Sequence, residues 1–343
     1  MICRRREPGC PSLEWGRHHF HGRLSVETAE TASLKDRARK KLERDAGPLI
    51  IDALNDPQTV ELMCNGDGKL WLEQLGQPMK HIGDLRPAQA ESIIKTVAGF
   101  HGKEVTRNKP LLEGEWPLDG SRFAGQLPPV VRAATFAIRK KAVAIYTLDQ
   151  YVESSIMTPV QCDAIKRAIR EHRNILVIGG TGTGKTTLVN AVINEMVVEF
   201  PAERVFIIED TGEIQCAAKN FVQYHTTVDV SMTHLLKTSL RMRPDRILVG
   251  EVRGEEALDL IDAWNTGHPG GAATLHANSA SEGLTRLKSL VSRNKSAPAE
   301  IEPLIGEAVH VVISIARTPE GRRIQEILEV SGYENGRYLM RNL

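Results

Sequence analysis

The chain has no surplus of either charge, and it lacks the patterns that mark several large classes of protein. Its 343 residues carry 44 lysines and arginines against 43 aspartates and glutamates, so bulk positive charge gives no support for direct binding to nucleic acid. The longest apolar runs, such as residues 309–316, are too short to span a bilayer. We therefore expect a cytoplasmic protein that reaches a membrane only through partners.

Cysteine is scarce and unpatterned. The five cysteines, Cys3, Cys10, Cys64, Cys162 and Cys216, are odd in number and never form C-x-x-C. This spacing argues against a disulfide framework and against a zinc ribbon.

The order of the predicted elements divides the chain into two domains. Residues 1–32 show no hydrophobic periodicity, and we expect a disordered extension there. Residues 33–146 predict a smaller α+β domain, residues 147–158 a linker, and residues 159–343 a larger α/β domain. In the first domain, the Asn-Gly turn at 65–68 predicts a hairpin of strands 60–64 and 69–73, followed by a helix at 87–100.

The larger domain alternates predicted strands and helices, which is typical of a parallel sheet. The helices are predicted at 187–200, 232–241 and 255–264, after a helix that starts at Thr158-Pro159. The strands are predicted at 174–178, 204–208, 246–250 and 271–275. Residues 310–317 and 323–330 predict a closing antiparallel hairpin.

One segment of this domain carries the first chemical signal. Residues 179–186, GGTGTGKT, match the phosphate-binding pattern G-x-x-x-x-G-K-[ST] between a predicted strand and a predicted helix. Glycines let the backbone fold around phosphate oxygens, and amides at the helix N-terminus then meet the anion. The residues expected to contact the nucleotide are Gly180, Thr181, Gly182, Thr183, Gly184, Lys185, Thr186 and Thr187.

Two residues of this loop have distinct expected roles. Lys185 can reach the β- and γ-phosphates of ATP and assist catalysis, and the Thr186 hydroxyl can bind Mg²⁺. We therefore predict a site for ATP and Mg²⁺. A chance glycine-rich turn is the alternative, and the flanking strand and helix argue against it.

The next two predicted strands end in carboxylates. Glu209, Asp210 and Glu213 follow the strand at 204–208, and the carboxyl ends of strands in an open α/β sheet face the ligand crevice. Glu209 is a candidate for catalysis and for Mg²⁺ binding, directly or through water; a solvated loop is the alternative. After the strand at 246–250, Gly250 stands where a metal-binding Asp is usual, and Glu251 is the leading candidate to orient the attacking water.

Histidines and arginines complete the set of candidates. His276 ends the predicted strand at 271–275 and can donate a hydrogen bond toward the γ-phosphate, although a core histidine is the alternative. Arginines can stabilise the charge that spreads over a transferring phosphoryl group. Those considered are Arg241, Arg243 and Arg253 in the larger domain, and Arg122, Arg132 and Arg139 in the smaller one.

Taken in order, four segments resemble the secretion ATPases of the type II/type IV secretion superfamily, and within it the conjugal-transfer ATPases of type IV systems. They are the Walker A loop at 179–186, the acidic box IIEDTGEIQ at 207–215, the Walker B strand RILVGEVRGEEA at 246–257, and the His box TGHPGGAATLHAN at 266–278. Pro269 inside the His box departs from the family pattern. The resemblance covers residue 32 to the C-terminus and is firmest over 174–290.

The resemblance implies a homohexamer in which a RecA-like P-loop NTPase domain is stacked with the N-terminal domain. It implies ATP between the two domains of one chain, with Arg122 and Arg139 closing over the phosphates. It also implies docking on secretion-channel components at the cytoplasmic face of the bacterial inner membrane, where hydrolysis drives pilus assembly or substrate transfer.

Three alternatives stay open. A type IV pilus or type II secretion assembly ATPase is the nearest, although the paired C-x-x-C motifs common in type II enzymes are missing. A GTPase-like switch would need an N-K-x-D signature after the P-loop, and none follows. A DNA-translocating RecA-like ATPase is disfavoured by the balanced charge.

Overall fold

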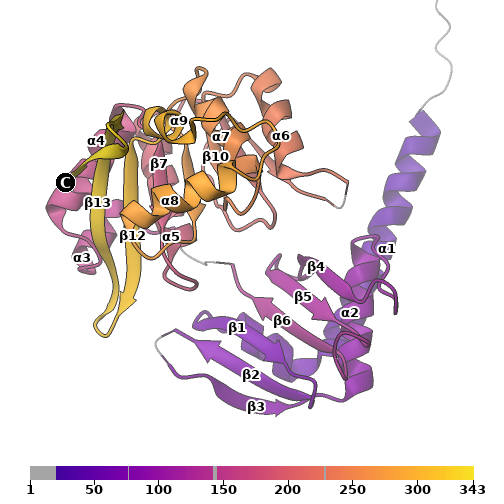
Figure 1. The fold of residues 1–343 in the computed structure, drawn as a ribbon. Coiled ribbons are helices and arrows are strands. Elements are labelled where there is room, and N and C mark those ends of the chain that lie inside the picture. Colours follow the sequence, from indigo (N-terminus) through magenta and orange to yellow (C-terminus); the bar gives the residue numbers. More distant parts are fainter. Residues whose placement is uncertain (1–20, 76, 142–144, 228) are drawn as a thin grey trace, which may run out of the picture. The chain divides into compact units, whose positions relative to one another are not determined.

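The computed structural model describes residues 21–75, 77–141, 145–227 and 229–343, which divide into two units (Figure 1). The first unit runs to Asp119 and includes Phe123–Ala137, and the second comprises Gly120–Arg122 with Ile138–Leu343. The main division therefore falls at residues 137–138. The segment expected to be a linker, 147–158, contains helix α3, Leu148–Glu153.

The first unit combines a six-stranded sheet with two helices, α1 (His21–Asn55) and α2 (Pro87–Phe100). Strand order is β3-β2-β1-β6-β5-β4. The strands are β1 (Thr59–Cys64), β2 (Lys69–Gln74), β3 (Lys80–Asp84), β4 (Leu111–Glu115), β5 (Arg122–Gln126) and β6 (Thr135–Arg139). Leu42 and Ile50 from α1 and Ile93 and Ile94 from α2 are fully buried, because both helices present an apolar face to the core.

The structure confirms the predicted hairpin of this unit but not the disorder expected in the segment before it. The hairpin is present as predicted, with Cys64 paired to Leu70 and Gly68 in the left-handed region at φ +84°. Helix α1 begins at His21, so residues 21–32 are helical rather than a disordered extension. Ala and Glu favour a helix even without an apolar stripe, which is why periodicity missed this part. Residues 1–20 of the expected extension lie outside the described residues.

The second unit is built on an eight-stranded sheet of order β14-β13-β12-β7-β11-β10-β8-β9. From β12 to β9 the neighbouring strands are parallel, and β13 and β14 are antiparallel. The strands are β7 (Ile175–Ile178), β8 (Val205–Glu209), β9 (Phe221–His225), β10 (Arg246–Val249), β11 (Ala272–Leu275), β12 (Val311–Thr318), β13 (Gly321–Glu334) and β14 (Arg337–Asn342). This confirms the predicted α/β class with a parallel sheet and a closing hairpin.

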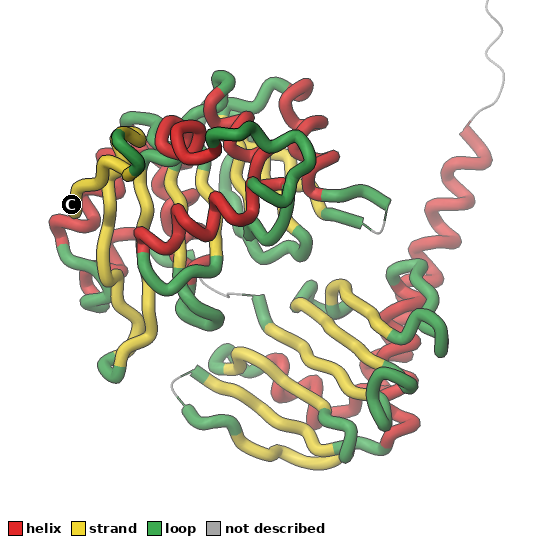
Figure 2. Tube along the Cα trace, in the orientation of Figure 1, coloured by secondary structure: helices red, strands yellow, loops and turns green. Residues whose placement is uncertain are grey.

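Helices cover both faces of this sheet (Figure 2). One face packs on α3, α4 (Pro159–Arg170) and α5 (Lys185–Glu199), and the other packs on α6 (Met232–Ser239), α7 (Glu256–Asn265), α8 (Ala280–Val291) and α9 (Ile301–Ala308). In β7, Ile175 and Val177 face the first layer while Leu176 and Ile178 face the second, as the two-residue period of a strand requires. Burial on both faces explains why these strands are continuous apolar runs.

Helix α4 begins as predicted from its first residues. Thr158 caps it by accepting a hydrogen bond from the Gln161 amide, Gln161 returns a bond to the Thr158 amide, and Pro159 occupies the first turn. Among the helices that the structure describes, none has the length and apolar character that crossing a bilayer requires.

Candidate active site

The P-loop joins the carboxyl end of β7 to the start of α5. A Cβ on Gly179 would lie 2.3 Å from the carbonyl oxygen of Ile315 on β12, so only glycine fits there. Gly182 and Gly184 have φ of +72° and +98°, which side chains with a Cβ rarely adopt. Thr183 braces the turn by donating to the Gly180 carbonyl at 3.0 Å. The loop therefore has the strand–turn–helix setting that places backbone amides at the mouth of a helix.

The Lys185 side chain folds back and binds carbonyl oxygens of its own P-loop. The side chain is largely buried, and Nζ donates to the carbonyls of Gly179 (3.0 Å) and Gly180 (2.8 Å). Nδ1 of His276 lies 3.4 Å from the same nitrogen. Burial lowers the pKa of Lys185 from its ordinary value, although the Glu251 carboxylate opposes this. A phosphate would supply the full negative charge that the carbonyls lack.

Glu209 ends β8 and organises the acidic box. The residue is 2% exposed, and its Oε2 accepts from the amides of Glu213 (2.9 Å) and Ile214 (3.0 Å) while Oε1 accepts from Gln223. Burial raises the pKa of Glu209 above its ordinary value, even though these hydrogen bonds favour the ionised form. Both oxygens of the Glu209 carboxylate thus already accept hydrogen bonds, which limits how closely the carboxylate can approach a ligand.

Gly250 explains why the Walker B strand carries no aspartate. A Cβ at position 250 would lie 2.8 Å from the Cβ of Glu209, closer than real Cβ contacts come. Glu209 on β8 therefore occupies the space that a side chain at the end of β10 would need. The absence of an aspartate at position 250 and the buried position of Glu209 therefore depend on each other, because a residue other than glycine at 250 would displace Glu209.

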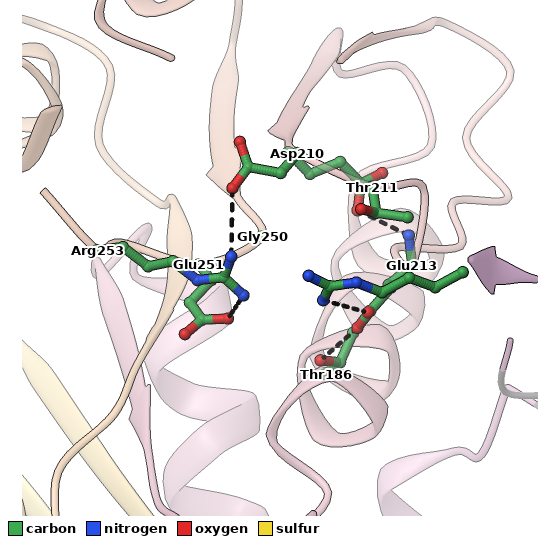
Figure 3. Close-up of a pocket in the computed structure, with 9 residues that line it drawn as sticks. Thr186, Asp210, Thr211, Glu213, Gly250, Glu251 and Arg253 are labelled. Carbon is green, nitrogen blue, oxygen red and sulfur yellow. Dashed lines mark hydrogen bonds and ion pairs between the residues drawn. The ribbon is translucent and has the colours of Figure 1, made fainter. Parts of the chain in front are cut away.

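Glu251 lies between two partners at the end of β10. Its Oε1 is 2.9 Å from His276 Nε2. Its Oε2 accepts from Arg253 at 2.6 Å (Figure 3). Burial would raise the pKa of Glu251, but Arg253, His276 and Lys185 together hold it below its ordinary value. Glu251 is therefore an ionised carboxylate whose orientation is fixed from both sides.

Residues from four segments, one of them Arg122, line one pocket at this edge of the sheet (Figure 3). They include Thr186 from α5, Glu209, Asp210, Thr211 and Glu213 from the acidic box, and Gly250, Glu251 and Arg253 from the segment after β10. The Thr186 hydroxyl lies 3.4 Å from Glu213 Oε2, and Arg253 lies 3.5 Å from Asp210 Oδ2. The structure therefore brings together the P-loop, the acidic box and Glu251, as their places after parallel strands predicted.

These residues suit a magnesium ion that also has phosphate ligands. The Thr186 hydroxyl and the Glu213 carboxylate face one another, and Mg²⁺ is usually held by one or two carboxylates together with substrate phosphates and water. In the described part of the chain, no group of three His, Cys, Asp or Glu side chains is arranged as a metal cage of its own. A metal here would depend on the nucleotide.

Sequence reasoning did not single out Asn190. It lies on α5 one turn beyond the P-loop and is 1% exposed. Its side chain accepts from the Gln215 amide at 3.1 Å and donates to the Glu213 carbonyl at 3.4 Å, so it ties α5 to the acidic box. An amide on the buried side of an otherwise apolar helix was the signal that could have found it.

Of the arginines considered from the sequence, Arg253 and Arg122 line this pocket and Arg241 does not. Arg241 lies in the short 3₁₀ helix Leu240–Met242 that precedes β10, so it is at the opposite end of that strand from Glu251. The two ends of a strand meet opposite edges of the sheet, and a role for Arg241 at phosphate stays a prediction.

Arg122, the first residue of β5, belongs to the second unit and lines this pocket, with its Nη1 3.5 Å from Glu213 Oε1. Arg139 is the last residue of β6. Contact of either arginine with phosphate remains a prediction.

The first half of the His box also lies at the amino edge of the sheet. Arg246 is fully buried there, donates to the Gly270 carbonyl at 2.8 Å and to Glu203, and lies 4.9 Å from the centre of the Phe200 ring. Gly270 has φ +81°, and a Cβ on it would meet Arg246 at 2.6 Å. The glycines before β11 therefore make room for Arg246. Of the two His-box histidines, His276 is the one that contacts Lys185 and Glu251.

The chain belongs to the family of Type II/IV secretion system proteins, whose family model matches residues 121–330. This confirms the resemblance seen in the motifs. The chain is 48% identical over 299 residues to the probable conjugal transfer protein TrbB of Sinorhizobium fredii, covering 87% of this chain and 91% of that relative. It is 46% identical over 299 residues to the conjugal transfer protein TrbB of Rhizobium radiobacter, covering 87% and 92%.

Solved structures give the same picture of the fold. The pilus retraction motor PilT, solved with bound ADP, matches with a TM-score of 0.59 and 19% identity over 81% of this chain and 80% of that one. At this identity the likeness establishes the fold alone.

Proposed function

We propose that this protein is the ATP-hydrolysing motor of a type IV, conjugal-transfer secretion system. The observation that carries the proposal is the position of Glu251, an ionised carboxylate fixed by Arg253 and His276 at the same sheet edge as the P-loop. The relatives named as conjugal transfer proteins support the cellular role. The reaction is ATP + H₂O → ADP + phosphate.

Binding begins at the P-loop. Backbone amides of residues 180–187 receive the phosphates, and Lys185 exchanges its two loop carbonyls for phosphate oxygens. Thr186 would hold Mg²⁺, and Glu209 would act on the metal through water, because its oxygens already accept hydrogen bonds from the acidic box. When bound, Mg²⁺ neutralises charge on the phosphates.

Hydrolysis relies on Glu251. Its carboxylate orients and polarises the attacking water, and its low pKa keeps it ionised for that role. Arg253 and His276 hold the carboxylate in place from opposite oxygens. His276 also contacts Lys185, so a single histidine links the residue that grips the phosphates with the residue that orients water.

Assembly and closure complete the proposal. The second unit is RecA-like and assembles as a homohexamer, and Arg122 and Arg139 help to close over the phosphates. Arg241, which lies at the far end of β10 from Glu251, acts on the nucleotide of a neighbouring subunit. The ring docks on secretion-channel components at the cytoplasmic face of the inner membrane, where closure and reopening do mechanical work.

The nearest alternative is a type IV pilus or type II secretion assembly ATPase. The fold likeness to PilT fits both readings. The two relatives with 46% and 48% identity are named for conjugal transfer, and this favours the first.

A genetic complementation experiment tests the proposal. Lys185→Ala should bind nucleotide poorly, lose at least about a thousandfold in hydrolysis, and fail to restore plasmid transfer to a donor strain that lacks this gene. Arg286→Ala, an exposed change on α8, is the matched control and should restore transfer. Near-normal hydrolysis by Lys185→Ala would contradict the motor assignment.

Assembly is tested separately. Sedimentation with Mg²⁺ and a non-hydrolysable ATP analogue should give a hexamer. A strict monomer under all conditions would contradict the ring.

A further inference from the structure

The hairpin of β12 and β13 extends past the end of β7 alongside the P-loop (Figure 1). Ser314 pairs with Ile178, the last residue of β7, so residues after Ser314 run beside the loop itself. The backbone of Ile315 already limits Gly179 to glycine. The part of the hairpin that follows Ser314 therefore borders the P-loop, although the mechanism above uses none of its residues.

One arginine of the hairpin rests on the P-loop. Arg322 Nη2 lies 3.4 Å from the Gly182 carbonyl oxygen, and a Cβ on Gly184 would lie 3.1 Å from Arg322 Cδ and 3.3 Å from Nε. The contact spans 140 residues of sequence, so no local motif announces it. A guanidinium at this place is next to the loop amides that phosphates require.

A second arginine adds to the charge on the same face. Arg317 is directly opposite Arg322 in the antiparallel register, and residues directly opposite share a face of the sheet. The ion pairs found in the described part of the chain give neither arginine a carboxylate partner. Two like charges directly opposite repel, which a bound polyanion would relieve.

We propose that Arg322 contacts the polyphosphate of the bound nucleotide from the hairpin side of the P-loop, with Arg317 as the neighbouring charge. The inference rests on the proposed nucleotide site at Lys185. A guanidinium suits this contact because its several N–H donors can bind phosphate while one of them still meets the Gly182 carbonyl. Since ADP and ATP share the phosphates near the loop, the contact should strengthen binding of both.

The test is the affinity of a fluorescent ADP analogue for three variants of the full chain. Arg322→Ala and Arg322→Gln should each weaken binding by about tenfold or more, because charge-assisted hydrogen bonds are roughly twice as strong as neutral ones. Arg322→Lys keeps the charge and should recover part of the loss. KM for ATP should rise by a similar factor with kcat little changed.

The glutamine variant separates contact with phosphate from bracing of the loop. Its amide can still donate to the Gly182 carbonyl but carries no charge. Wild-type affinity in Arg322→Gln would show that Arg322 only braces the loop, and would overturn the proposal. So would unchanged affinity in Arg322→Ala.

Two further proteins make the result unambiguous. Arg323→Ala is the matched control, because Arg323 pairs with Ala316 on the opposite face of the hairpin and should leave affinity unchanged. An equal loss in Arg323→Ala would count against the proposal. Lys185→Ala separates the two levels of inference: if Lys185→Ala loses ADP binding while Arg322→Ala does not, the nucleotide site stands and only the hairpin contact fails.

Discussion

At the amino edge of the second sheet, Arg246, Glu203 and His172 bind one another. At the carboxyl edge, Glu251 lines a pocket and Lys185 contacts the phosphate-binding loop. His172 Nε2 lies 2.6 Å from one oxygen of Glu203, and Arg246 binds the other. At the carboxyl edge, the cation Lys185 is satisfied by two carbonyls, which carry no net charge. At the amino edge a buried cation is held by a carboxylate, whereas at the carboxyl edge Lys185 donates to neutral carbonyl oxygens that a phosphate can replace.

The His box runs through both regions. Its glycines before β11 fit around Arg246, and His276 after β11 contacts Lys185 and Glu251. Since β11 is only four residues long, one short strand connects a structural network with the candidate active site. Variants at the two edges should therefore separate stability from catalysis.

The largest expected effect on stability comes from the amino edge. Arg246→Ala would leave Glu203 with His172 as its remaining partner, and breaking a buried ion pair in this way costs about 3–5 kcal/mol of unfolding free energy. The midpoint of urea unfolding measures the loss. Arg286→Ala, on an exposed face of α8, should change stability by less than about 0.5 kcal/mol. Equal stability of the two variants would show that the amino edge does not stabilise the fold.

A smaller effect should come from the packing of Gly250 against Glu209. In Gly250→Ala the new Cβ would push on Glu209, and overpacking of this kind costs about 1–3 kcal/mol. When this cost raises the barrier to hydrolysis, the ATPase rate should fall about five- to a hundredfold. The rate should fall further in Gly250→Asp than in Gly250→Ala. Steady-state ATPase rates measure this. Normal turnover by the Gly250→Asp enzyme would show that Glu209 does not require glycine at position 250.

The smallest expected effect is a pH dependence at the carboxyl edge. Burial, followed by the Lys185 cation, lowers the pKa of His276 in the folded chain. The unfolded chain then binds a proton that the folded chain excludes, so stability from this group falls as pH drops below the ordinary histidine pKa of about 6.5. His276→Asn should therefore lose less Tm than the wild type between about pH 7 and about pH 5.5. Identical losses of Tm would contradict this sign.

The sequence predicted the parts of the site that lie directly after strands. Lys185, Glu251 and His276 each follow a short apolar strand, and parallel strands bring their carboxyl ends to one edge. Arg241 precedes its strand, so this logic does not place it at that edge, and its role stays a prediction.

Other parts of the site depend on packing between distant segments. Gly250 packs against Glu209, and Arg322 contacts the P-loop. Both contacts join segments that are far apart in sequence, so no local pattern encodes them. The edge strands β9 and β14 were missed because they are only partly buried, so their apolar pattern is weak.

The central claim is that Glu251 activates water at the carboxyl edge, and single-turnover hydrolysis by Glu251→Gln tests it most directly. With MgATP bound at normal affinity, the rate of phosphate formation should fall by about a hundredfold or more, because the amide cannot polarise water as the carboxylate does. The urea midpoint of the same variant should stay well above that of Arg246→Ala. Phosphate formation at the wild-type rate would remove Glu251 from this role and contradict the account.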